Sequence, residues 1–139
     1  MNYQKNLIEL VNTIPQTVSS LSSLNLGVVR HKICHNDFIY DGNTSLTIKS
    51  AGWYFISVKA DITSTVANQP MVIGLYVNGN LIPETETNLF EATAGSQGNA
   101  SFTKIIKICQ NDPAILTLRN GSSATTIYND VIMDVIKIA

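Results

Sequence analysis

The chain has 139 residues, of which 45% are hydrophobic and 14% are charged, and its formal net charge is −1. The near-neutral charge, without a Lys/Arg cluster, excludes the basic surface of a nucleic-acid-binding protein, and no apolar run reaches the roughly 20 residues that span a membrane. The opening residues MNYQKNLIEL lack the basic and apolar regions of a secretory signal. We therefore expect a soluble protein that assembles in a cytoplasm, with no nucleic-acid partner and no membrane insertion.

Residues 1–25 differ in pattern from the rest of the chain. Their apolar positions follow the spacing of heptad a and d positions, which predicts a short N-terminal helix that ends near Pro15. The residues at these positions are Tyr3, Leu7, Leu10 and Ile14. Two interpretations of this seam remain open. The helix packs on its own domain, or it forms an oligomer stalk or docks into a partner.

Residues 26–139 contain no helical pattern, and short apolar strands alternate with turn signals. The segment WYFISVKADIT alternates, with Tyr54, Ile56 and Val58 on its inner face. The dipeptide Asn78–Gly79 indicates a tight hairpin, because both residues accept positive φ angles. Further predicted strands lie in LGVVRHKICH, SLTIKSAG, SFTKIIKIC, AILTLR and TTIYNDVIMDVIKIA. About eight short strands without crossover helices predict an all-β sandwich or barrel.

Two of these strands are apolar on both faces, which is unusual for a sandwich whose outer faces meet water. The residues on their second faces are Val72, Gly74 and Tyr76 in one strand and Ile132, Ile136 and Ile138 in the other. An exposed apolar face of this kind promotes aggregation unless something covers it. We therefore expect an outer face to pack on another subunit, and self-association is the first functional prediction.

The segment LTIKSAGWYFISVKADI resembles the signature of the complement globular-head domain and its tumour-necrosis-factor-like relatives. Leu46, Gly52 and Tyr54 match the order of an apolar residue, five spacers and Gly-x-Tyr, although Leu46 and Ile56 stand where Phe is usual. The following GLYVNGNLIP resembles the family's next hairpin. The resemblance implies a jelly-roll β-sandwich of about eight to ten antiparallel strands, assembled as a homotrimer. The expected trimer-interface residues are Tyr76, Trp53, Phe55, Ile132, Ile136 and Ile138.

The resemblance also implies an order of parts, in which residues 1–25 form a stalk or docking segment and residues 26–139 form the head. From this order we predict a structural protein of a bacteriophage virion: a head fibre, a capsid decoration or a tail appendage. Its N-terminus would dock on a capsid or tail protein.

Recognition functions form the alternative. One is a receptor- or carbohydrate-binding head that contacts a glycan or protein of the host-cell surface. A third interpretation, separate from recognition, is a bacterial surface or spore-coat protein with the same fold. Trp53, Phe55 and Phe90 are candidates for ligand contact, although packing in the core or between subunits explains such aromatic residues more simply.

Catalytic and metal sites are not expected. In HKICH, His31 and His35 would share a strand face about 13 Å apart, too far to chelate one zinc ion. Cys34 and Cys109 are interpreted as small buried thiols, because a reducing compartment disfavours a disulfide. Turn formation explains acidic residues such as Asp37 and Asp41. The sequence predicts neither an enzyme nor a cofactor.

Overall fold

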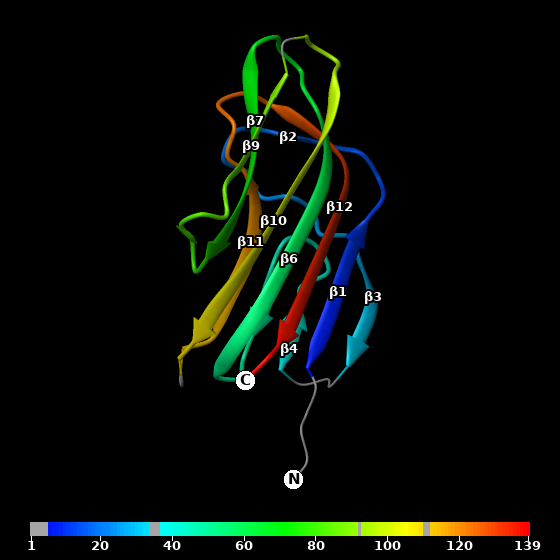
Figure 1. The fold of residues 1–139 in the computed structure, drawn as a ribbon. Helices are drawn as coiled ribbons and strands as arrows, with labels where there is room; N and C mark the ends of the chain where they lie inside the picture. Colours follow the sequence, from blue (N-terminus) through cyan, green and yellow to red (C-terminus); the bar gives the residue numbers. More distant parts are fainter. Residues whose placement is uncertain (1–5, 34–36, 92, 110–111) are drawn as a thin grey trace.

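The chain folds into a sandwich of two six-stranded sheets, which confirms the all-β prediction. The computed structural model describes residues 6–33, 37–91, 93–109 and 112–139, and no helix occurs within them. Sheet A has the order β10-β6-β12-β1-β3, with β2 paired to β12, and these five strands lie side by side in Figure 1. Sheet B has the order β4-β5-β11-β7-β8, with β9 paired to β7. The strands are β1 Leu7–Asn12, β2 Gln16–Val18, β3 Val28–Ile33, β4 Phe38–Tyr40, β5 Leu46–Ile48, β6 Gly52–Thr63, β7 Gln69–Val77, β8 Asn80–Leu81, β9 Thr87–Glu91, β10 Gln97–Ile108, β11 Ala114–Asn120 and β12 Thr126–Lys137.

The predicted N-terminal helix is wrong, because residues 7–12 form strand β1 inside sheet A. β1 pairs with the last strand, β12, on one side and with β3 on the other. Side chains alternate between the two faces of β1. Ile8 and Leu10 are buried in the core, and Leu7 faces outward. A helix this short is marginal in water. Pairing on both sides instead gives β1 two hydrogen-bonded ladders.

Within the described residues, no helix is long and apolar enough to cross a membrane.

The predicted heptad seam is therefore not one surface. Leu7 and Leu10 lie on opposite faces of β1. Ile14 lies beyond the end of this strand and is 73% exposed. Tyr3 lies outside the described residues. The expected boundary after residue 25 falls between β2 and β3, which are both strands of sheet A.

The core lies between the two sheets and is filled by the inward side chains of the long strands. On β6 these are Tyr54, Ile56 and Val58, as the alternation predicts, and none is more than 1% exposed. The ring of Phe38 from β4 meets Tyr54 edge-on, with ring centroids 6.3 Å apart. Further core residues are Val131, Met133 and Val135 from β12 and Met71, Ile73 and Leu75 from β7. Burial of these side chains stabilises the sandwich.

A buried polar network connects the two sheets. The Tyr128 hydroxyl, from β12, lies 2.8 Å from the Val72 carbonyl oxygen of β7 and 3.0 Å from Asn120 Oδ1 of β11. Asn120 Nδ2 donates to the carbonyl oxygens of Val18 and Ala124. Because nearly every buried polar group in a folded protein is hydrogen-bonded, this network fixes the position of the chain after β11.

Candidate functional site

The outer face of sheet A carries an apolar row that crosses five strands. Direct cross-strand partners point to the same face of a sheet. Phe55 on β6 pairs with Ile105 on β10 and with Ile136 on β12. Ile136 pairs with Leu7 on β1, and Leu7 pairs with Ile33 on β3. The first apolar row is therefore Ile105, Phe55, Ile136, Leu7 and Ile33. Its two ends, Ile105 and Ile33, are 51% and 53% exposed.

A second apolar row crosses three strands of the same face. It consists of Ile132 on β12, Val11 on β1 and Val28 on β3. Val28 is exposed, and a cavity of about 390 Å³ opens beside it, lined in part by Val11 and Ile14. Apolar surface therefore continues past the end of β1.

A polar row separates the two apolar rows. It consists of Thr103, Ser57, Asp134, Glu9 and His31, which are successive cross-strand partners. Glu9 and Asp134 lie directly opposite each other, an arrangement that is destabilising when both groups are charged. Arg30 Nε donates to Glu9 Oε1 at 2.5 Å, and His31 Nε2 lies 3.9 Å from the same oxygen.

The surrounding groups shift the pKa values of Glu9 and Asp134 in opposite directions. The hydrogen bond from Arg30 lowers the pKa of Glu9 to about 2, and a hydrogen bond with Asp134 adds to this effect. Burial raises the pKa of Asp134 to about 6, helped by the hydrogen bond and the negative charge of Glu9. Between these values the pair holds one proton, and the carboxylate on Glu9 is neutralised by Arg30.

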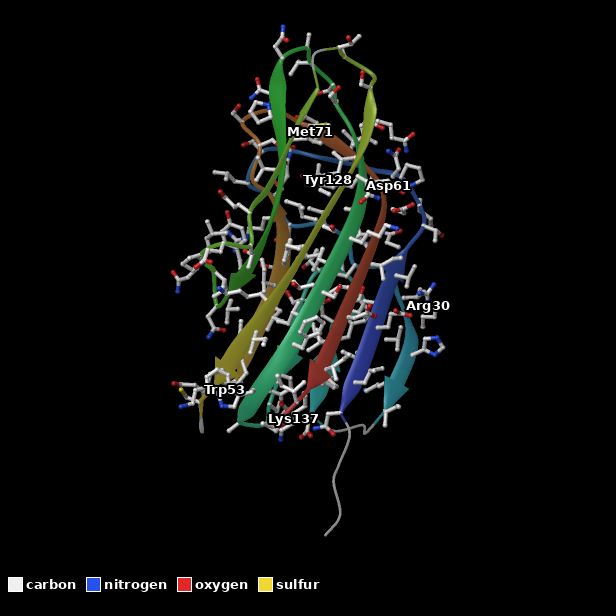
Figure 2. All side chains as sticks on the ribbon, viewed as in Figure 1. Arg30, Trp53, Asp61, Met71, Tyr128 and Lys137 are labelled. Carbon is white, nitrogen blue, oxygen red and sulfur yellow. The ribbon has the colours of Figure 1, made fainter. Side chains whose placement is uncertain are left out.

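A second acidic pair lies farther along the same face. Asp61 on β6 pairs with Asp130 on β12, and its backbone N–H donates to Asp130 Oδ1 at 3.3 Å. Asn99 Nδ2 donates to Asp61 Oδ1 at 2.6 Å. Burial raises the pKa of Asp130, and the neighbouring Asp61 raises it further. In Figure 2, Asp61, Arg30 and Trp53 mark well-separated positions on the sheet A side of the molecule.

Trp53 stands near one end of the face, 45% exposed. Lys107 Nζ lies over its indole ring, 5.6 Å from the ring centroid. Four of the residues predicted from the sequence as interface residues share the outer face of sheet A: Trp53, Phe55, Ile132 and Ile136. Ile138 lies just past the end of β12 and is 53% exposed. Glu9 and Arg30 were missed, because the alternation of β1 was interpreted as a helix and β3 was not paired with it.

Tyr76, the remaining predicted interface residue, lies on the outer face of sheet B. Its ring packs against the Arg119 guanidinium, whose carbon lies 4.5 Å from the ring centroid. The NG hairpin is confirmed: Asn78 and Gly79 have φ angles of 53° and 82°. After this turn β8 pairs beside β7, and the Leu81 side chain packs against Gly74, where its Cδ1 would lie 3.0 Å from an added Cβ.

A turn on the other side completes this cover. The Gly121 N–H donates to the Val72 carbonyl oxygen, and the Ser122 hydroxyl accepts from the Val72 N–H at 2.7 Å. Val72 is 7% exposed as a result. The apolar second face of β7 is thus covered within the chain, whereas no element among the described residues covers the first apolar row of sheet A.

Solved structures with the same fold come from complement and tumour-necrosis-factor-like proteins. The globular domain of zebrafish complement 1qA aligns over 96% of this chain and 98% of its own, with a TM-score of 0.74 and 9% identity. Murine APRIL at pH 5.0 aligns over 96% and 99%, with a TM-score of 0.70 and 9% identity. Eiger TNF from S. frugiperda aligns over 100% and 94%, with a TM-score of 0.72 and 8% identity. The chain has the complement-head and TNF-like jelly-roll fold. No protein-family model matches the sequence, and no curated protein does.

Other predicted positions bring no chemical site together. No three His, Cys, Asp or Glu side chains in the part of the chain that the structure describes could hold a metal ion. Cys34, His35 and the Phe90 side chain lie outside the described residues. The Cys109 thiol is exposed, so its prediction as a buried thiol is wrong. Asp41 is confirmed as a turn residue, because Oδ1 accepts the N–H groups of Asn43 and Ser45.

Proposed function

We infer that the chain is the head of a homotrimer that assembles through the outer face of sheet A and serves as a receptor-binding head. The observation that carries this inference is the first apolar row, which runs unbroken from β10 through β6, β12 and β1 to β3 and ends in exposed isoleucines on both of these edge strands. Apolar surface of this extent on a folded domain marks an interaction site. The shared fold supports an assembly of this type, and none of the three similar structures named above is described as an enzyme.

Solution mass measured by light scattering on the full chain tests the assembly. We expect a mass of three times 15.1 kDa. Ile105→Lys places a charge at the end of the apolar row and should shift the mass toward that of one chain. Ile115→Lys is the matched control, because Ile115 is a similarly exposed isoleucine on β11 of sheet B. A single-chain mass for the wild type at all concentrations at both pH 5.0 and pH 8.0, or an equal effect of the two substitutions, would contradict the proposal.

The carrier of the head stays a prediction from the sequence. A bacteriophage virion, with the head as head fibre, capsid decoration or tail appendage, is one carrier, and a bacterial cell or spore surface is the other. Attachment to a capsid or tail protein would not use a helical seam, because Leu7 and Leu10, two of the four predicted seam residues, belong to strand β1 of sheet A. Mass spectrometry of purified virions and of spore and cell-surface fractions distinguishes these locations.

A further inference from the structure

The acidic pair Glu9–Asp134 lies inside the face that the proposed trimer would bury. Both apolar rows run past it, one on each side, so no assembly can cover the two rows and leave the pair in water. The Glu9 side chain is only 15% exposed in the single chain, and Asp134 is half-buried. Burying an ionised carboxylate without a partner is strongly unfavourable. The protonation state of this pair therefore affects the free energy of assembly.

The charges around the pair come from three neighbouring strands. On β3, Arg30 and His31 face Glu9. On β6, the direct neighbour of Asp134 is the uncharged Ser57, and Lys59 lies one pair farther along. On β10, the next residue in the row is the uncharged Thr103. On β12 itself, Asp130 lies on the same face beyond Ile132, where it interacts electrostatically with Lys59.

Only one of the two carboxyl groups has a cationic partner among the described residues. Arg30 is hydrogen-bonded to Glu9, and among the described residues Asp134 takes part in no ion pair. With one proton on the pair, the cluster of Glu9, Asp134 and Arg30 has no net charge. Without that proton it carries one uncompensated negative charge in the middle of an apolar face.

We propose, on the basis of the function inferred above, that assembly through sheet A takes up a proton on the Glu9–Asp134 pair, so that the trimer is favoured at mildly acidic pH and dissociates as the pH rises. The geometry supports this: the two carboxyl groups are direct cross-strand partners, only Glu9 is ion-paired, and both groups lie between two apolar rows. The exposed ring of His31 remains at the edge of the face, with a side chain that is 69% exposed.

The direction and size of the effect follow from Asp134. Its pKa is about 6 in the single chain, so the group is mostly protonated at pH 5 and mostly ionised at pH 8. If only the protonated chain assembles, the apparent affinity falls with the protonated fraction, by up to about 100-fold per subunit at pH 8.

Sedimentation equilibrium of the full chain at pH 5.0 and pH 8.0, at equal ionic strength, measures this effect. The wild type should associate more tightly at pH 5.0. Asp134→Asn and Glu9→Gln each leave one carboxyl group for one Arg30, so both should associate at pH 8.0 about as tightly as the wild type does at pH 5.0. Circular dichroism confirms that each variant is folded, and either variant alone tests the inference if the other is not.

Two controls make the result specific. Asp112→Asn removes the same charge from an exposed loop and should keep the pH dependence of the wild type. His31→Asn should also keep it, and loss of the dependence in that variant would overturn the proposal in favour of the imidazole. A wild-type trimer whose affinity does not change with pH, or weakens at pH 5.0, overturns the acid-pair inference and leaves the proposed function intact. A single chain at both pH values, in the wild type and both acid-pair variants, overturns both.

Discussion

The outer faces of both sheets carry apolar residues at positions where a solvent-exposed face would carry polar ones, and the reason differs between the two sheets. On sheet B, the second face of β7 is apolar because the chain itself covers it, with Leu81 over Gly74 and the Gly121 turn beside Val72. On sheet A, the corresponding face of β12 meets no covering element among the described residues. An apolar second face in a strand sequence therefore indicates a cover, and only the fold shows whether the cover is intramolecular. Disturbing sheet B should change the stability of one chain, and disturbing sheet A should change its association.

Asn120→Ala should have the largest effect on the covered side. The amide of Asn120 holds the turn after β11 by donating to Val18 and Ala124 and by accepting from Ser122 and Tyr128. Its loss leaves several buried groups without partners, and we expect the free energy of unfolding to fall by about 3 kcal/mol or more. Urea denaturation measures this at any protein concentration.

Asn80→Ala is the control for this substitution, because Asn80 is exposed on β8. A change within about 0.5 kcal/mol is expected there. If Asn120→Ala lost less than about 1 kcal/mol, which is the contribution of a single ordinary hydrogen bond, the network would not be what holds the cover in place.

Thr85→Val should have the next largest effect. The buried Thr85 hydroxyl accepts from the Leu75 N–H at 3.1 Å and donates to the Ile82 carbonyl oxygen at 2.7 Å, which fixes the loop after β8 against β7. Valine has nearly the same shape but cannot pair with the buried N–H, so a loss of about 2 kcal/mol is expected in urea denaturation.

Thr85→Ser keeps the hydroxyl and removes one methyl group, so it should lose about 0.8 kcal/mol. A larger loss for serine than for valine would mean that packing, and not the hydrogen bonds, holds this loop.

The sequence predicts the face of a residue well where a strand is long and regular. Phe55 and Ile136 were each placed on the correct face of their own strand, because alternation over the twelve residues of β6 and of β12 fixes which side each residue takes. The N-terminal strand could not be recognised in this way. Leu7 and Leu10 fit helical spacing. Residues 7–12 form a strand because they pair with β12, where Leu7 lies opposite Ile136 near the far end of the chain, and the local sequence does not show this pairing.

Tyr76 shows the second limit of sequence reasoning. Its strand was correctly predicted, and so was the following turn, but the pattern does not show that Leu81 returns over the same face. The acid pair was missed for a related reason. Asp134 is visible as a break in an apolar strand, but its relation to Glu9 depends on a cross-strand register between the two ends of the chain.

The pH dependence of unfolding should also reveal the acid pair in the single chain. The lowered pKa of Glu9 contributes stability that is present above about pH 4.5 and is lost as the pH falls toward 2. The raised pKa of Asp134 contributes stability that is present below about pH 3.8 and is lost as the pH rises through about 6. The contribution of the pair to the unfolding free energy is therefore largest at about pH 4, where the increase from Glu9 ends and the decrease from Asp134 begins.

Urea midpoints at pH 3, 4.5 and 7.5, measured at high dilution, test both limbs. Asp134→Asn should remove the decline between pH 4.5 and 7.5 that the pair produces. A wild-type midpoint that rises steadily from pH 3 to 7.5, and does so equally in Asp134→Asn, would contradict the assignment.

Lys107→Gln should have the smallest effect, because it removes a contact on the uncovered face. The ammonium group lies over the Trp53 ring, but both side chains are exposed, and a cation–π contact of this kind contributes about 0.5 kcal/mol. Lys49→Gln, at an exposed position between β5 and β6, is the control and should leave the unfolding free energy unchanged. A loss above about 1.5 kcal/mol would mean that Trp53 supports the fold of the single chain. A small loss of unfolding free energy agrees with the difference between the covered face of sheet B and the uncovered face of sheet A. Side chains on an uncovered face contribute little to the stability of one chain, because they leave water only when a second subunit covers them.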